Sequence, residues 1–487
     1  MSSYSASGES TLRPPPDEVL TRIASYIHQP PSFTPLAYQT ARLCLLDTIG
    51  CGLEGLRVSG ELRAVMGPVV EGAELSNGAK VIGTNYKLDP VQAAFNIGAM
   101  IRWLDFNDCF LAAEWGHPSD SLGTILAITS YLSNTDPSKK FTVKDVLEAM
   151  IQAHEVQGGL ALLNSLNRVG LDHVAFVKIA STAVASKLMG FTEERTIDAL
   201  SQAFVDGQSL RTYRHAPNTG PRKSWAAGDA CARAVWLCLM VKKGQIGYPS
   251  ALTAKKWGFY DVLFAGKPFE FQREFGCYVM ENVLFKISYP AEFHAQTAVE
   301  AAHTLHGVLK SKGLSSDDIK SVKIRTQEAA IRIIDKSGPL HNYADRDHTL
   351  QYMAAIPLIF GRLTTEDYSD DVASDHRIDE LREKMVCVEE KQFSVDYLDP
   401  EKRSIGNAIT LTLKDGTVLD EVVVEYPVGH RRRRDEGTPL LLEKFKRHIV
   451  PHFSPARQEE IMAATVDLKQ LEQMPLQDFV DLWIPEK

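Results

Sequence analysis

The sequence predicts a mainly α-helical protein, in which a smaller α+β lid domain is inserted before the C-terminal helices of a large helical-bundle domain. Apolar residues recur at helical spacing from residue 17 to about 275, and this spacing returns from 433 to 487. Between 276 and 432, β-branched and aromatic residues alternate in several segments. We therefore expect a helical domain at 17–275 and 433–487, a lid at 276–432, and a disordered Ser- and Pro-rich tail at 1–16.

The helices of the first part are expected where apolar residues follow a period of 3.6. The clearest segments are residues 18–27, 37–53, 143–156 and 230–244. Turn residues such as Pro30-Pro31, Gly60 and Asn77-Gly78 separate the periodic segments. These features together predict a helix bundle.

The lid is expected to combine strands with helices. Strands are predicted at 321–326, at 408–426 with a hairpin turn over Lys414–Thr417, and at 278–289. Helices are predicted at 291–313 and 349–363. In the C-terminal segment, we expect Thr438 to cap a helix and Ser454-Pro455 to open the next one. Such an insertion would leave a cleft between two domains, where ligands commonly bind.

Composition excludes several functional classes. The net charge of −9 is modest, and interspersed charges give no support for nucleic-acid binding. The longest apolar stretches are too short for a membrane-spanning helix, which needs about 20 residues. Seven cysteines without a CxxC pair fit a reducing compartment. We expect a cytoplasmic protein, or one of the mitochondrial matrix if the source is a eukaryote, although Arg13 is the sole basic residue of the tail.

Ionisable residues cluster in three places in the helical part. One stretch, "RWLDFNDCFLAAEWGHPSD", sets Asp105 and His117 among apolar residues, where a capped helix end is the main alternative to catalysis. His173 stands directly ahead of an apolar helix, whose amino end attracts anions, although a surface or core histidine is more common. A third stretch could form a carboxylate cradle or an exposed basic loop; it holds Arg211, Arg214, His215, Arg222 and Lys223.

The lid offers further polar side chains that a cleft could bring opposite His117 and Lys223. They are Lys286, Glu292, His294, Arg346, His348 and Tyr352. No metal or cofactor is expected, because the sequence has no HExxH, no EF-hand loop and no P-loop. The basic run Arg431–Arg434 is interpreted as a solvated linker.

Several long strings of this sequence resemble the MmgE/PrpD family in the same order. They include "AEWGHPSD", "NRVGLDHV", "DGQSLRTYRHAPNTG", "RKSWAAGDA", "YVMENVLFKIS" and "VVVEYPVGH", and the resemblance runs from about Pro35 to the C-terminus. The resemblance implies a helical domain with a lid, a homodimer, and dehydration of 2-methylcitrate without a cofactor, in the methylcitrate cycle of propionate breakdown.

The resemblance also implies site residues, taken from the active-site pattern of a cis-aconitate decarboxylase in this family. The matching positions are Asp105, His117, His173, Lys223, Lys286 (with a spacing that differs by one residue) and Tyr352. Further substrate contacts are expected from Arg211, Arg214, His215, Arg222, His294 and Cys109. Cys109 stands where the family often has Thr, so a hydroxyl contact there is in doubt.

Dehydrating a tricarboxylate requires a base for a proton next to a carboxylate and an acid for the leaving hydroxyl. Histidine suits the base, so we expect His117 or His173, with the other histidine or Tyr352 as the acid. Lys223 and Lys286 would neutralise the carboxylate, and Asp105 would orient a histidine or lysine. The competing hypotheses are cis-aconitate decarboxylation, an aconitase-like citrate dehydratase or hydratase, and a non-catalytic helical scaffold.

Overall fold

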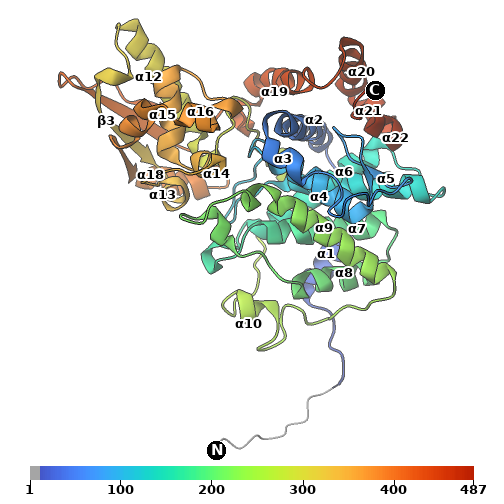
Figure 1. The fold of residues 1–487 in the computed structure, drawn as a ribbon. Coiled ribbons are helices and arrows are strands. Elements are labelled where there is room, and N and C mark those ends of the chain that lie inside the picture. The colour runs from blue at the N-terminus through green and yellow to red at the C-terminus, as the bar shows by residue number, and fades with distance from the viewer. Residues whose placement is uncertain (1–10, 487) are drawn as a thin grey trace, which may run out of the picture.

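The computed structural model describes residues 11–486, which form a mainly α-helical chain of two bodies (Figure 1). One hydrophobic core spans residues 19–287 together with 428–483, and the second joins residues 284–419 to Cys109, Leu111 and Trp115. This arrangement confirms the predicted fold class. The exact domain boundaries, between residues 275 and 276 and between residues 432 and 433, remain a prediction. Of the expected disordered tail, residues 11–16 form no helix or strand, and 1–10 lie outside the described residues.

The first body is built from helices whose ends carry the expected capping chemistry. Thr34 accepts from the backbone N–H of Ala37 ahead of Pro35, and Asp89 caps the next long helix in the same way. The helices are α1 (Glu18–His28), α2 (Pro35–Val58), α3 (Gly60–Val65), α4 (Pro90–Arg102), α5 (Leu122–Thr135), α6 (Val143–Ala161), α7 (Val174–Leu188), α8 (Glu193–Val205), α9 (Arg222–Lys242), α10 (Phe259–Leu263) and α11 (Tyr278–Asn282). Short strands β1 (Ala79–Lys80) and β2 (Lys87–Leu88) pair antiparallel.

Three glycines allow α4, α5 and α9 to pack with their backbones in contact. A Cβ atom added to Gly98 would lie 2.8 Å from Cα of Gly228, and one added to Gly123 would lie 2.7 Å from the amide nitrogen of Gly98. No residue with a side chain fits these three positions without moving a helix. The packing holds the amino end of α9, which carries Lys223, close to the end of α4.

The second body contains a four-stranded sheet in the order β4-β3-β5-β6. Its strands are β3 (Ile319–Thr326), β4 (Met385–Glu389), β5 (Asn407–Leu413) and β6 (Val422–Val424). The predicted strand at 321–326 and the hairpin around Lys414–Thr417 are confirmed, because β5 pairs antiparallel with both β3 and β6. The sequence prediction omitted β4, which runs parallel to β3.

Helices surround this sheet, and α12 lies against β5, β6 and α15. Both predicted lid helices are confirmed, with shorter bounds, by α12 and α15. The helices are α12 (Gln296–Ser311), α13 (Glu328–Ile334), α14 (Tyr343–Arg346), α15 (Leu350–Phe360), α16 (Asp370–Ala373), α17 (His376–Arg382) and α18 (Lys391–Leu398).

Two predictions of local structure were wrong. Residues 278–289 form no strand: the segment begins as α11 and then crosses between the two bodies, where Leu284 makes an isolated bridge to Cys109. Its alternating apolar residues are buried by this crossing rather than by a neighbouring strand. Thr438 does not cap a helix, because α19 already begins at Arg434 and the Thr438 hydroxyl donates to the Arg434 carbonyl inside it.

The C-terminal helices return to the first body. They are α19 (Arg434–Ile449), α20 (Pro455–Val466), α21 (Leu468–Gln473) and α22 (Leu476–Asp481). Figure 1 shows this red segment above the blue α2, and α19 packs directly on α2. Ser454 caps α20 as predicted. Among residues 11–486, every helix is too short or too polar to cross a membrane.

Candidate active site

Asp105 lies at the centre of a buried polar cluster where the two bodies meet. It follows the end of α4 and has a positive φ of 50°, which few non-glycine residues adopt. Lys286, from the crossing segment, donates to both its carboxylate and, at 2.6 Å, its carbonyl, and Arg102 Nη1 lies 2.7 Å from Oδ1. The other charged or titratable neighbours of the carboxylate are His117 at 3.7 Å, Lys223 at 3.9 Å and His348 at 3.5 Å.

The Asp105 carboxylate is ionised. Burial alone would raise the pKa of this carboxyl, but the charges of Arg102 and Lys286 outweigh burial and hold the pKa well below its usual range. The single negative charge of Asp105 thus balances only part of the positive charge of Arg102 and Lys286. The remaining positive charge is available to an anionic ligand.

His117 presents an unprotonated nitrogen to this cluster. Its Nδ1 lies 2.6 Å from the carbonyl oxygen of Asp108, and a carbonyl can only accept, so the proton is on Nδ1. Burial, together with Arg102 and Lys286, lowers the pKa of His117 well below 6.5, so the ring is neutral. Its Nε2, on the side of Asp105, is therefore a lone-pair acceptor, as a general base requires.

His173 is the residue before α7 and is arranged in a similar way. Its Nδ1 lies 2.9 Å from Asp172 Oδ1, and Arg214 donates to the other oxygen of that carboxylate. Burial lowers the pKa of His173 to about 4, so this ring is also neutral. The rings of His117 and His173 lie 5.6 Å apart in an edge-to-face arrangement.

Lys223, in the first turn of α9, connects the two bodies. Its Nζ donates to both carboxylate oxygens of Asp347 at 2.9 and 2.7 Å, and it lies 3.3 Å from Nδ1 of His348. Burial lowers the pKa of the Lys223 ammonium. Burial and the charge of Lys223 also lower the pKa of His348 to about 4.

Several buried donors and acceptors around the cluster have no hydrogen-bond partner within the described residues. They are Nη1 of Arg102 (although Asp105 is nearby), Nη1 of Arg211, Nη2 of Arg214, both ring nitrogens of His173 (although Asp172 is nearby) and the hydroxyl of Tyr343. Buried polar groups without partners are costly, and donors of this kind are satisfied when a ligand brings carboxylates. The arrangement can therefore bind a small polyanion beside a neutral imidazole.

Comparison with known proteins identifies the family. A model of the MmgE/PrpD N-terminal domain matches residues 21–272, and one of the MmgE/PrpD C-terminal domain matches residues 289–469. This chain belongs to the MmgE/PrpD family. It is 64% identical to a mitochondrial 2-methylcitrate dehydratase of Yarrowia lipolytica, over 97% of this chain and 91% of the relative. It is 60% identical to the 2-methylcitrate dehydratases of Cupriavidus necator and Escherichia coli K12, each over 97% of this chain and 98% of the relative.

In this MmgE/PrpD protein, most of the residues selected from the sequence converge on the cluster. Those within it or on its border are Asp105, His117, His173, Lys223, Lys286, Arg211 and Arg214. Cys109 is buried beside it, and its backbone pairs with Leu284. Burial raises the pKa of the Cys109 thiol well above its usual range.

The structure places four of the selected residues in other surroundings. The Tyr352 hydroxyl donates to the Asp367 carbonyl at 2.7 Å. His294 contacts Glu292 and the Tyr397 hydroxyl with its two ring nitrogens, at 2.7 and 3.0 Å. Arg222 pairs with Asp229 and lies over Trp225, while His215 is exposed.

Sequence reasoning missed four residues of the cluster or gave them no role. They are Arg102, Asp172, Asp347 and His348. Arg102 opens the same polar stretch as Asp105, and Asp172 directly precedes His173. Their position next to selected residues could therefore have indicated both of them. Asp347 lies 124 residues from Lys223, and nothing in the local pattern links them.

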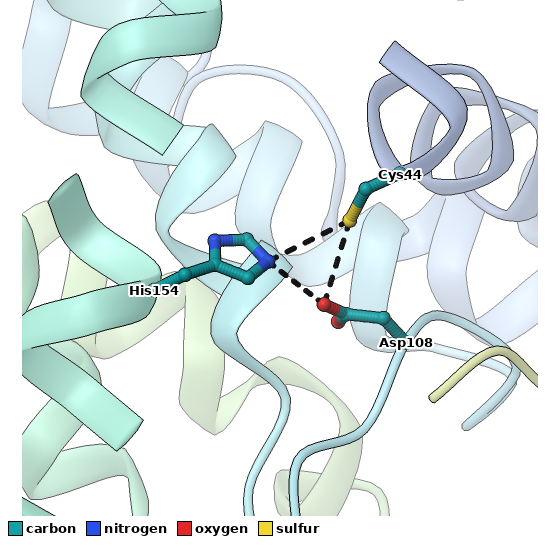
Figure 2. Close-up of side chains that lie close together, drawn as sticks. All are labelled: Cys44, Asp108 and His154. Atoms are coloured by element: carbon teal, nitrogen blue, oxygen red, sulfur yellow. Dashed lines mark hydrogen bonds and ion pairs between the residues drawn. The ribbon is translucent and has the colours of Figure 1, made fainter. Parts of the chain in front are cut away.

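One group of described residues has the side chains and spacing that a metal ion could use, namely Cys44, Asp108 and His154 (Figure 2). They lie on α2, on the loop after α4 and on α6. The group adjoins His117, whose Nδ1 contacts the carbonyl oxygen of Asp108. His154 Nε2 is 2.9 Å from Asp108 Oδ2, and Cys44 Sγ is 3.4 Å from the same oxygen. Hydrogen bonds account for each of these contacts.

Proposed function

We propose that this protein is a 2-methylcitrate dehydratase, which removes water from 2-methylcitrate to give 2-methyl-cis-aconitate in the methylcitrate cycle of propionate breakdown. The observation that carries the proposal is a neutral imidazole, His117, with its lone pair among the buried cations Arg102, Lys223 and Lys286. The choice of substrate is supported by the names of relatives that are 60–64% identical over nearly the whole chain.

His117 is assigned as the base. Nε2 takes the proton from the carbon that bears the methyl group and a carboxylate, and the electron pair of that C–H bond forms the new double bond. Negative charge develops on the adjacent carboxylate during this step, and fixed cations in a dry site stabilise it far better than water does. Lys286, Arg102 and the unpartnered donors of Arg211 and Arg214 suit that role.

Lys223 is assigned as the acid for the leaving hydroxyl, in place of the second histidine or Tyr352. The rings of His117 and His173 are both neutral, and the Tyr352 hydroxyl donates to the Asp367 carbonyl. Nζ of Lys223 carries protons at the cluster, and burial lowers its pKa, which makes it a stronger acid. The C–O bond breaks as the hydroxyl takes this proton, and the product leaves with water. Proton exchange with solvent then restores His117 and Lys223.

Ultraviolet absorbance of the conjugated product tests the proposal. We expect His117→Gln and Lys223→Met each to lower kcat by about 10²- to 10⁴-fold, the usual contribution of a positioned base or acid. Lys242→Met is the matched control, because Lys242 is an exposed lysine on the same helix, and its kcat should equal that of the wild type.

Other outcomes would favour the alternatives. Release of CO₂ from cis-aconitate without turnover of 2-methylcitrate would indicate a decarboxylase. Activity only after reconstitution with iron would indicate an aconitase-like enzyme. Wild-type protein that turns over none of these acids would support the helical scaffold.

A homodimer is the proposed assembly. Five large apolar side chains between residues 236 and 262 are exposed, and such side chains are frequent in protein interfaces. They are Trp236, Ile246, Tyr248, Trp257 and Val262. For the compartment, the mitochondrial matrix is the alternative to the cytoplasm, and the name of the Yarrowia relative, which says mitochondrial, supports the mitochondrion.

A further inference from the structure

Behind the proposed base lies a second buried group that takes no part in the proposed chemistry. Figure 2 shows its members, Cys44, Asp108 and His154, pointing toward one another from three different segments. All three side chains are fully buried. Ionisable groups in such a place need partners, and their partners indicate what the group does.

The Asp108 carboxylate is held on both oxygens. Oδ1 accepts from the backbone N–H of Ser119 at 3.2 Å and from the Ser119 hydroxyl at 2.5 Å. Oδ2 lies 2.9 Å from Nε2 of His154 and 3.4 Å from the sulfur of Cys44. The side chain thus ties the loop after α4 to α2, to α6 and to the segment that follows His117.

His154 is anchored in turn by its own helix. Its Nδ1 lies 2.8 Å from the carbonyl oxygen of Met150, one turn earlier on α6. Its Nε2 lies 2.9 Å from Oδ2 of Asp108, so both ring nitrogens lie within hydrogen-bonding distance of an oxygen atom. The His154 ring is therefore held at both nitrogens, between the Met150 carbonyl and the Asp108 carboxylate.

The backbone of Asp108 makes the connection to the base. Its carbonyl oxygen is the acceptor for Nδ1 of His117, at 2.6 Å. Because the side chain of Asp108 is fixed on both oxygens, the Asp108–Cys109 peptide is fixed in orientation and its carbonyl points at one place. That carbonyl selects the tautomer of His117 with the proton on Nδ1 and the lone pair on Nε2.

We infer that His154 and Asp108 are positioning residues, which set the tautomer and orientation of His117 through the Asp108 carbonyl. The inference deepens the proposed function and rests on it for the role of His117 as base. Neither residue touches the reacting atoms. Loss of the pair should leave substrate binding nearly intact and impair proton abstraction, since misplacing a reacting group by about 1 Å can cost about 10²-fold in rate.

The test combines kinetics with nitrogen-15 spectra of the histidine rings in full-length protein without substrate. In the wild type, the His117 signals should show one neutral tautomer with the proton on Nδ1. His154→Gln and Asp108→Asn should each give a mixture of tautomers at His117. For turnover of 2-methylcitrate, they should lower kcat by about 10- to 100-fold and change KM by less than about threefold.

Two further variants keep the test decisive. His28→Gln is the matched control, because it removes an imidazole that contacts the Thr196 hydroxyl at 2.8 Å, on α1 and α8, and it should change neither kcat nor the His117 spectrum. If His154→Gln does not fold, Ser119→Ala removes one donor from Asp108 and should produce a smaller shift in the same direction.

The inference is overturned if folded His154→Gln keeps both the wild-type tautomer and the wild-type kcat. It is also overturned if one zinc or iron ion per chain copurifies with the wild type and is lost from Cys44→Ser, because metal ligation would then replace the hydrogen bonds. A wild type that shows the Nδ1 tautomer but does not dehydrate 2-methylcitrate would contradict the proposed function and leave the positioning geometry intact.

Discussion

Individual residues in the cluster divide into charged and neutral groups because of their surroundings. Asp105 remains ionised although it is buried, since Arg102 and Lys286 contact it directly. His117 is as deeply buried but has more cations than anions nearby, so burial and like charge both oppose its protonation. The same fold therefore provides fixed positive charge and a neutral imidazole a few ångströms apart.

The pH profile follows from these shifts. The proposed base works only when neutral, and the pKa of His117 lies well below 6.5, while that of His173 is about 4. Lowering the pH from 8 to 6.5 therefore protonates neither ring. We expect kcat/KM for 2-methylcitrate, corrected for the ionisation of the substrate itself, not to decrease as the pH is lowered over that range and to fall only at lower pH. A corrected profile with a midpoint near 6.5 would show that His117 titrates as an ordinary histidine.

At the scale of elements, the packing of α9 on α4 positions Lys223 in the polar cluster around Asp105. Lys223 and Gly228 lie on α9 little more than one turn apart, and Gly228 is where the backbone of α9 touches that of α4. Asp105 follows the end of α4. The separation of these two helices therefore sets the separation of the charged groups that they carry.

Gly228→Ala should accordingly affect stability and activity together. The added Cβ would lie 2.4 Å from the Phe95 carbonyl oxygen, so α9 must move away from α4. We expect a loss of about 1–3 kcal/mol in the free energy of unfolding, measured with urea, and a lower kcat.

The control for this change is Gly307→Ala, at an exposed position of α12 where an added Cβ meets nothing within 4 Å. It should stabilise the protein by roughly 0.5–1 kcal/mol, because alanine favours a helix over glycine. Equal effects of the two substitutions would argue against close backbone packing at Gly228.

Over the whole molecule, the polar cluster lies where the two bodies and the C-terminal segment meet. Asp347, from the second body, holds Lys223 of the first. Lys444 of α19 contacts Asp47 of α2 at 2.8 Å and donates to the carbonyl of Lys286 at 2.6 Å. The C-terminal helices thus brace the crossing segment that delivers Lys286 to Asp105.

The proposed dimer is tested at the same scale. Sedimentation velocity should give a mass of twice 54.0 kDa for the wild type. Trp257 is 73% exposed, and Trp257→Lys should shift the distribution toward the monomer, because a charge would enter an apolar interface. Val395→Lys, at an exposed position of α18, is the control and should leave the mass unchanged. A monomeric wild type would exclude the proposal.

The sequence by itself determined the features that depend on neighbouring residues. Helical and alternating apolar periods predicted the two kinds of body, Ser454-Pro455 predicted the start of α20, and Lys414–Thr417 predicted a hairpin. Long motifs indicated the MmgE/PrpD family, which the family models confirm. The same motifs predicted Asp105, His117, His173, Lys223, Lys286 and Tyr352 as site residues. Local periodicity, capping and turn chemistry involve only a few consecutive residues, so one sequence suffices to identify them.

Only the tertiary structure decided which ionisable groups meet. Asp347 and His348 reach Lys223 from more than 120 residues away, and His154 sits in a helix whose periodic pattern shows no sign of its contact with Asp108. The same packing turns the Tyr352 hydroxyl toward the Asp367 carbonyl. It also leaves Arg222, in the first turn of α9, paired with Asp229. Burial, partner charges and hydrogen-bond direction depend on residues distant in the chain. The protonation of His117 and its available nitrogen follow from packing and cannot be deduced from the residue or its motif.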